Sequence, residues 1–131
     1  MTVQLDGFTR NLLDRKNFPI VATVGPDGSA RGSVIWAHRH DNHAVFMVAR
    51  GGRKHRDILR DNRISLSLFD VEDPYRSVEI RGIAEVTEEN SYELAHELIE
   101  KYTGEKNTTI DEPPVFVRLI PTALLHYPKQ S

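Results

Sequence analysis

The positions of the apolar residues along the chain predict short strands more often than helices. Residues 20–24, IVATV, are rich in strand-forming side chains, and GPDG at 25–28 supplies the residues of a tight turn. A second strand is predicted at 29–38, and HDNH at 40–43 turns the chain into a third strand at 44–49. Three strands joined by tight turns predict an antiparallel meander.

The second half of the chain continues the strand pattern. RISLSLFD at 63–70 alternates apolar and polar residues, and so does SVEIRGIAEV at 77–86. We expect VEDPYR at 71–76 to be a loop between these two strands. VFVRLIPTALLHY at 115–127 predicts one last strand, or two strands broken at Pro121.

Helical spacing is confined to a few segments. Leu5, Phe8 and Leu12 recur at helical intervals and predict an amphipathic helix at 6–16. A longer helix is expected between Thr87 as N-cap and Gly104 as the residue after its end. Its apolar face comprises Tyr92, Ala95, Leu98, Ile99 and Tyr102. Six or so antiparallel strands with two or three short helices predict a mainly β (α+β) domain, a closed or partly closed barrel.

Composition narrows the class of protein. A length of 131 residues predicts a single domain, residues 1–131, and 39% hydrophobic with 27% charged residues is typical of a folded protein. With no cysteine, disulfides and thiol nucleophiles are excluded, and the composition fits the cytoplasm. No signal peptide or membrane span is expected. A pI of about 6.3 argues against general nucleic-acid binding.

A basic stretch at 48–63, VARGGRKHRDILRDNR, departs from this balance. It carries a net charge of +4 in a chain whose net charge is −2. Its cations are Arg50, Arg53, Lys54, Arg56, Arg60 and Arg63, against Asp57 and Asp61. Gly51 and Gly52 lead into a short helix, and a helix start offers free N–H groups to an anion. The stretch is either a site for a phosphate or carboxylate ligand or a solvated basic helix face.

Histidines and the single tryptophan leave alternatives open. His38, His40 and His43 are either a metal cluster or, as we favour, a polar strand end beside a turn. His55 could help to bind an anion when protonated, whereas the isolated His96 and His126 are expected to be structural. Trp36 either packs in the core or lines a cofactor, and a proton donor such as His38 or Tyr75 has no geometric support from sequence.

The order of these signals resembles a known family. ATVGPDG, SVIW, a strand ending in ARG, RKHRDILRDNRISLSLFD and DPYRSVEIRG follow one another between residues 18 and 86, with a weaker likeness to residue 127. This order is similar to that of the pyridoxamine 5′-phosphate oxidase-like split-barrel family, an antiparallel FMN-binding fold. Within the family the chain looks like the branch that binds the deazaflavin coenzyme F-420.

The resemblance implies a homodimer with two cofactor sites at the interface. The flavin ring would lie along Ser33, Val34, Ile35 and Trp36. The phosphate would be held by Ala49, Arg50, Arg53 and Lys54, with Arg56 and Asp57 nearby. Lys54 matches the phosphate cation of this branch. No metal site and no catalytic side chain are implied.

The activity implied is hydride transfer from reduced F-420 to a conjugated small-molecule acceptor, whose identity the sequence does not give. An FMN-dependent oxidoreductase of the same fold is one alternative. A non-enzymatic flavin or F-420 carrier is a second, and a haem protein with His38, His40 or His43 as axial ligand is a third. Nucleic-acid binding is disfavoured because no aromatic residues are interleaved with the basic stretch.

Overall fold

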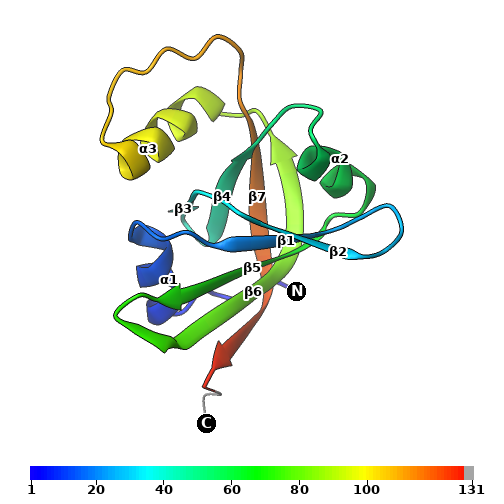
Figure 1. The fold of residues 1–131 in the computed structure, drawn as a ribbon, viewed down its shortest axis with the longest axis vertical. Helices are drawn as coiled ribbons and strands as arrows, with labels where there is room; N and C mark the ends of the chain where they lie inside the picture. Colours follow the sequence, from blue (N-terminus) through cyan, green and yellow to red (C-terminus); the bar gives the residue numbers. More distant parts are fainter. Residues whose placement is uncertain (129–131) are drawn as a thin grey trace.

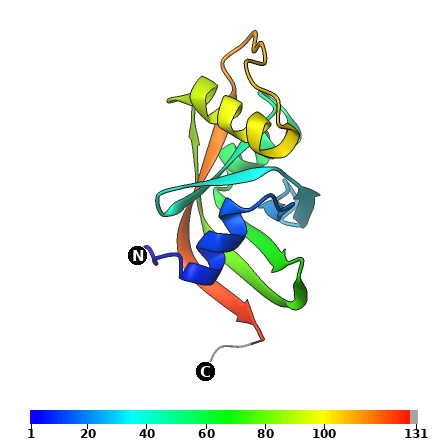
Figure 2. The ribbon, with the colours of Figure 1, turned by 90° about the vertical axis from the view of Figure 1, so that its left-hand side faces the viewer.

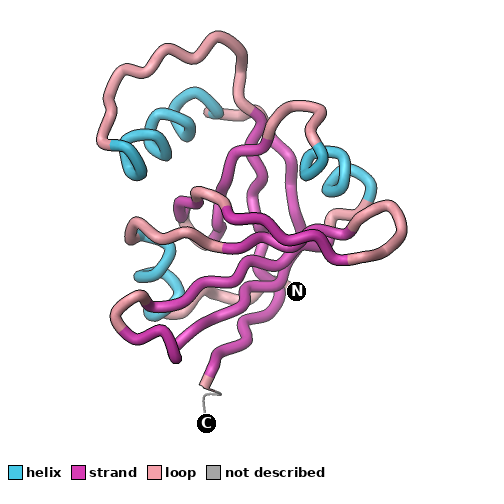
Figure 3. Tube along the Cα trace, in the orientation of Figure 1, coloured by secondary structure: helices cyan, strands magenta, loops and turns pink. Residues whose placement is uncertain are grey.

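A computed structural model describes residues 1–128, which form seven strands and three helices (Figure 1). The elements in chain order are α1 (Gly7–Asp14), β1 (Ile20–Val24), β2 (Ala30–Val34), β3 (Ala37–His40), β4 (His43–Val48), α2 (Arg53–Arg60), β5 (Arg63–Asp70), β6 (Asp73–Thr87), α3 (Ser91–Thr103) and β7 (Val115–Tyr127). Figure 3 shows how strands dominate the trace and how a long loop joins α3 to β7.

All seven strands belong to one antiparallel sheet in the order β2-β1-β5-β6-β7-β4-β3. The two outermost strands, β2 and β3, are consecutive in the chain and are joined only through Ile35 and Trp36. The sheet therefore curls on itself with a gap between these two strands, which is the split in the barrel. The predicted mainly β, antiparallel barrel with short helices is confirmed.

Apolar side chains from alternate strand positions fill the interior of the barrel. Val21, Phe46, Leu66 and Ile80 are all fully buried, because each lies at an inward position of its strand. Leu12 of α1 is buried in the same cluster, so α1 closes one end of the barrel.

A second apolar cluster lies outside the barrel. Leu98 and Tyr102 of α3 pack on Val45 of β4 and Phe116 of β7. Figure 2 shows α3 and α1 on the same side of the sheet, facing the viewer. The long β7 strand thus has a buried face on each side, toward the barrel and toward α3.

The predicted strand at 29–38 is wrong, because the chain breaks it into β2 and β3. The N–H of Ile35 donates to the carbonyl of Pro19 at 2.9 Å in the β1–β2 register, and the ladder ends there because Pro19 has no N–H to donate in return. Beyond this point the chain crosses from one edge of the sheet to the other. Strand propensity does not reveal such a crossing, because Ile35 and Trp36 are themselves good strand formers.

The predicted loop at 71–76 is also wrong, since β6 begins at Asp73 and the hairpin ladder runs almost to its tip. Phe69 pairs with Ser77 and Asp70 with Asp73, across a register shift. The last segment is one strand, and Pro121 lies opposite Gly82 next to a bulge in β7, where Thr122 has no partner in the register.

The two terminal helices differ from prediction mainly at their ends. α1 is shorter than 6–16 and begins after Asp6, whose side chain accepts from the N–H of Thr9. α3 begins after Asn90 rather than after Thr87, because the Thr87 hydroxyl accepts from Glu89 in a turn before the helix. Tyr92, expected on the buried face of α3, is exposed.

Candidate functional site

The turn between β4 and α2 presents free backbone donors. Gly51 has a φ of 72°, which favours glycine, and its N–H donates to Nδ1 of His55 at 2.9 Å. Gly52 is the N-cap, and the first helical hydrogen bond runs from the N–H of Arg56 to its carbonyl. The N–H groups of residues 53–55 therefore have no partner within the helix, as at any helix start.

Pairing sorts the six cations of the basic stretch into two groups. Arg50 contacts Glu88 at 2.7 Å, Arg60 contacts Asp57 at 2.8 Å and Arg63 contacts Asp61 at 2.7 Å. Within residues 1–128, Arg53, Lys54 and Arg56 form no salt bridge. The uncompensated positive charge is concentrated at the start of α2.

Lys54 is the partly buried member of this unpaired group. Its Nζ donates to the hydroxyl of Ser33 on β2 at 3.1 Å. Partial burial lowers the pKa of Lys54, and the neighbouring charge of Arg53 lowers it further. An anion placed beside Lys54 would stabilise its charged form and offset the repulsion from Arg53, so the local electrostatics favour an anionic ligand here.

Two hollows meet at Lys54. One of about 260 Å³ is lined by Val34, Ile35, Trp36, Met47, Lys54 and Leu98. The other, of about 380 Å³, is lined by Met47, Val48, Ala49, Gly52, Arg53 and Lys54. Because Met47 and Lys54 line both, the hollows adjoin, one with a largely apolar wall and one at the cationic helix start.

Trp36 forms the aromatic wall of the first hollow. Its ring stacks on that of Tyr102, with centroids 4.9 Å apart and planes 2° apart. The Tyr102 hydroxyl accepts from the N–H of Ala37 at 3.1 Å and donates to the carbonyl of Asn17. Trp36 keeps 38% of its surface exposed, so it is not a core residue.

The structure gathers most of the predicted site residues. Val34, Ile35, Trp36, Ala49, Arg53 and Lys54 line the two hollows, and Ser33 touches Lys54. The remaining three line neither hollow. Arg50 contacts Glu88 and the carbonyl of Pro113, and Arg56 is exposed. Asp57 is buried on the side of α2 that faces β1 and β2.

Sequence reasoning missed Met47 and Leu98. Met47 points outward from β4, and the alternation of side chains along a strand could have identified this position. Leu98 could not have been found in this way, because nothing in the sequence places α3 over this hollow.

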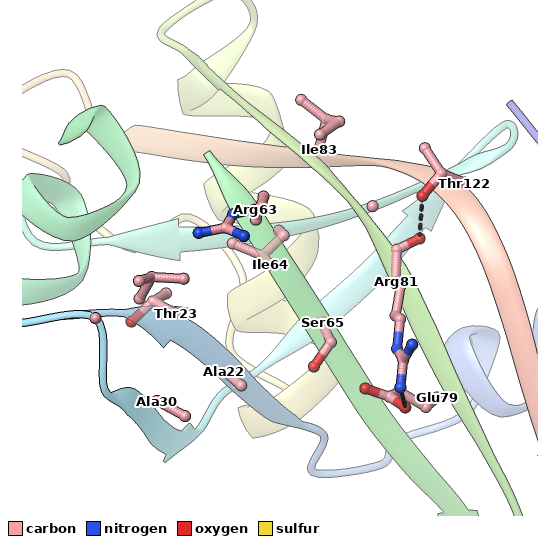
Figure 4. A pocket seen from close by; sticks show the side chains of 13 residues that line it. Ala22, Thr23, Ala30, Arg63, Ile64, Ser65, Glu79, Arg81, Ile83 and Thr122 are labelled. Carbon is pink, nitrogen blue, oxygen red and sulfur yellow. Dashed lines mark hydrogen bonds and ion pairs between the residues drawn. The ribbon is translucent and has the colours of Figure 1, made fainter. Parts of the chain in front are cut away.

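A larger hollow of about 560 Å³ lies on the outer face of β1, β5 and β6 (Figure 4). Small side chains such as Ala22, Ala30 and Ser65 form its floor. Its charged groups are already paired, Arg81 with Glu79 at 3.3 Å and Arg63 with Asp61. This larger hollow therefore lacks the unpaired cations that line the two smaller hollows. For that reason it is not our candidate for the anion site, although its volume is greater.

His38, His40 and His43 line neither of the two adjoining hollows. His38 is 4.0 Å from Glu97 of α3, and burial lowers its pKa. His40 and His43 pair across the β3–β4 turn. Within residues 1–128 no three metal-ligating side chains come together. His126 contacts Asp6 at 2.6 Å and fastens the start of α1 to β7, in keeping with a structural role.

No helix in the described part of the chain, residues 1–128, has the length and apolarity needed to cross a bilayer. The cytoplasmic location stays a prediction.

Comparison with known proteins agrees with the fold. A family model described as pyridoxamine 5′-phosphate oxidase matches residues 5–126. A search of curated protein sequences found no match to this chain.

Among solved structures, an F-420 reductase is 25% identical, with a TM-score of 0.76 over 92% of this chain and 97% of its own. A conserved hypothetical protein from Mycobacterium tuberculosis is 22% identical, with a TM-score of 0.81 over 96% and 86% of the two chains. General Stress Protein 26 from Bacillus anthracis is 13% identical, with a TM-score of 0.71 over 92% and 91%.

Because the family model covers nearly the whole chain, the protein belongs to the pyridoxamine 5′-phosphate oxidase family. The last two structures share the fold with it.

Proposed function

We propose that this protein is an oxidoreductase that uses reduced coenzyme F-420 and transfers a hydride to a conjugated small-molecule acceptor. The observation that carries the proposal is the meeting, at Lys54, of a hollow walled by Trp36 with the cationic start of α2. A flavin-type cofactor has the matching shape, a flat ring joined to a phosphate. The 25% identity to an F-420 reductase supports the same conclusion.

Arg53 and Lys54 are the residues that would hold the phosphate, together with the free N–H groups at the start of α2. Val34, Ile35 and Trp36 would border the ring. The N–H of Ile35 and the N–H of Ala37 already donate to Pro19 and Tyr102. The N–H of Trp36 has no acceptor within residues 1–128, so it is a backbone donor available to a ring carbonyl.

The choice of F-420 over FMN rests on the unpaired charge. FMN carries one phosphate, which Arg53 and Lys54 can satisfy between them. Arg56 is exposed one helical turn beyond Arg53 and has no acidic partner within residues 1–128. A third free cation favours a ligand whose negative charge extends past the phosphate, as the carboxylate tail of F-420 does. Arg50, already neutralised by Glu88, lies outside this path.

The bound cofactor would supply the hydride, and solvent would supply the proton that completes reduction of the acceptor. The protein's part is to bind and orient. The Tyr102 ring holds Trp36 in place, and Leu98 of α3 closes one side of the hollow against water.

We also propose that the protein is a homodimer joined through the outer face of the sheet. Val34, Ile20 and Leu125 are 63%, 50% and 40% exposed. Strand register places them in one row across β2, β1, β5, β6 and β7, with Ser67 and Glu79 between Ile20 and Leu125, beside the hollow of Figure 4. Exposed apolar side chains aligned in this way are typical of a surface that a partner covers. Since Val34 also lines the candidate ring site, the cofactor would lie at the interface.

Side-by-side titration with F-420 and FMN, followed by the fluorescence of Trp36, tests the proposal. Trp36 is the only tryptophan, so its signal reports on this site alone. We expect both to quench it, with F-420 binding more tightly and losing affinity as salt rises. Tighter binding of FMN would favour the FMN-dependent alternative. Binding of F-420 without reduction of any acceptor in a panel of quinones, enones and nitroaromatics would favour the carrier. Binding of neither would overturn the assignment.

A further inference from the structure

Asp57 is a buried carboxylate with partners on three elements. It is 1% exposed. Arg60 of α2 donates to it at 2.8 Å, the Thr23 hydroxyl of β1 at 3.2 Å and Arg31 of β2 at 3.4 Å. A carboxylate that is removed from water in this way is stable only while these partners stay in place.

The β1–β2 hairpin is shaped to let Arg31 reach this carboxylate. A Cβ atom built on Gly25 would lie 2.7 Å from Nε of Arg31, so a larger residue here would displace the arginine side chain from its present path to Asp57. Arg60 also donates to the carbonyl of Val24 at 3.0 Å, beside the same turn. The hairpin and the second turn of α2 are thus fixed against each other around one buried charge.

The consequence for the candidate site lies in strand β2. It is an edge strand, hydrogen-bonded to β1 on one side only. Two side-chain contacts connect it to α2: Arg31 reaches Asp57, and Ser33 accepts from Lys54 at 3.1 Å. A phosphate that binds Lys54 competes with the second contact, whereas the contact through Asp57 does not involve the ligand.

We propose that Asp57 is a positioning residue that sets the spacing between the ring-binding end of β2 and the phosphate-binding start of α2. This inference rests on the proposed flavin-type ligand. A ligand that spans both halves gains affinity because the halves are held at the right separation. Fragments that occupy one half do not depend on that separation. Asp57 therefore acts on the linked cofactor without touching it.

The sign of the effect separates this role from simple electrostatics. Asp57→Asn removes a negative charge near an anion site, so electrostatics alone would strengthen anion binding. Asp61→Asn makes the same change of charge four residues along the chain, at a carboxylate whose partner is the exposed Arg63. A positioning role predicts weaker binding for Asp57→Asn only.

The test measures Kd for three probes with the wild type, Asp57→Asn and Asp61→Asn. The probes are the flavin nucleotide that the wild type binds, the same ring and ribityl chain without phosphate, and inorganic phosphate. We expect Asp57→Asn to weaken binding of the complete nucleotide about tenfold and to change binding of either fragment less than twofold. Thr23→Val, which keeps the net charge, should give a smaller loss of the same kind and serves if Asp57→Asn does not fold.

Equal losses for nucleotide and fragments, or no loss in Asp57→Asn and Thr23→Val, would overturn the positioning role and leave the proposed function intact. A wild type that binds no flavin nucleotide at all would instead refute the proposed function.

Discussion

The rings of Trp36 and Tyr102 are parallel within 2° and 4.9 Å apart, which ties the crossing segment between β2 and β3 to helix α3. The Tyr102 hydroxyl adds hydrogen bonds to the backbone of Ala37, at the start of β3, and of Asn17, which precedes β1. Phe18 packs edge-on against the other side of the Tyr102 ring. A single side chain of α3 thus orients the wall of the candidate ring site.

Replacement of Tyr102 separates its two contributions. Tyr102→Phe keeps the stack and loses the hydroxyl, so we expect a loss of about 1–2 kcal/mol in the free energy of unfolding with an unchanged Trp36 emission maximum. Tyr102→Leu also removes the stack and should shift the Trp36 emission to longer wavelength. Chemical denaturation and fluorescence spectra measure both effects. An unchanged Trp36 spectrum in Tyr102→Leu would contradict the orienting role.

Lys54→Ala should weaken binding of the flavin ligand by about tenfold, because a charge-assisted contact to the phosphate is lost. Arg63→Ala is the control, since Arg63 is already paired with Asp61 and lies beyond the helix start. Fluorescence titration at low and moderate salt measures both variants. An equal loss in the two variants would indicate diffuse attraction by the basic stretch rather than a defined site.

Ile20→Glu should convert the proposed dimer to a monomer, because it places a charge beside the exposed Val34 in the row of the sheet face proposed as the interface. Leu59→Glu is the matched control: Leu59 is 66% exposed on α2, outside that row. Analytical ultracentrifugation gives the oligomeric state. We expect Ile20→Glu alone to dissociate and to lose flavin affinity with it. A dimer that survives in Ile20→Glu would place the interface elsewhere.

Gly82→Ala should destabilise the protein by about 2–4 kcal/mol, since a Cβ at this position would lie 2.2 Å from the carbonyl oxygen of Ile120. Gly32→Ala on β2 is the control. There the nearest atom to an added Cβ is 3.7 Å away, so the fold should accept it with little change. Urea denaturation of the two variants tests the difference, and similar stabilities would contradict the close approach of β6 and β7.

Lys101 gives the stability of the protein a pH dependence. Burial lowers its pKa to about 8, although its Nζ donates to the carbonyls of Leu13 and Ala37 at 2.6 and 2.8 Å. The unfolded chain keeps its lysine protonated to a higher pH and so binds more protons between pH 8 and about 10. The unfolding free energy therefore gains from this group as pH rises through that interval.

Denaturation at pH 7.5, 8.5 and 9.5 measures this gain. Lys101→Met should remove it, whereas Lys16→Met, at an exposed lysine, should retain it. A wild type and Lys101→Met with the same pH slope would show that Lys101 is not desolvated in solution.

Local sequence determined most of the strands and the start of α2. Alternating residues in RISLSLFD and the GPDG turn are short-range signals, and they place β5 and the β1–β2 hairpin where the structure has them. The glycines before Arg53 likewise predict a helix start with free N–H groups. These features depend on residues within a few positions of one another, so the sequence carries them directly.

Tertiary structure decided which of those residues meet. The break at Ile35 and Trp36 depends on Pro19 and Tyr102, which lie far from it in the chain or across a turn. The free charge at α2 could not be counted from the sequence either, because Glu88 neutralises Arg50 from a distance of 38 residues. The sequence alone predicted a basic stretch and a barrel. Only the packing of distant elements left Arg53, Lys54 and Arg56 without acidic partners within residues 1–128 and brought Lys54 to the hollow of Trp36, because contacts between remote segments follow from the whole fold rather than from local pattern.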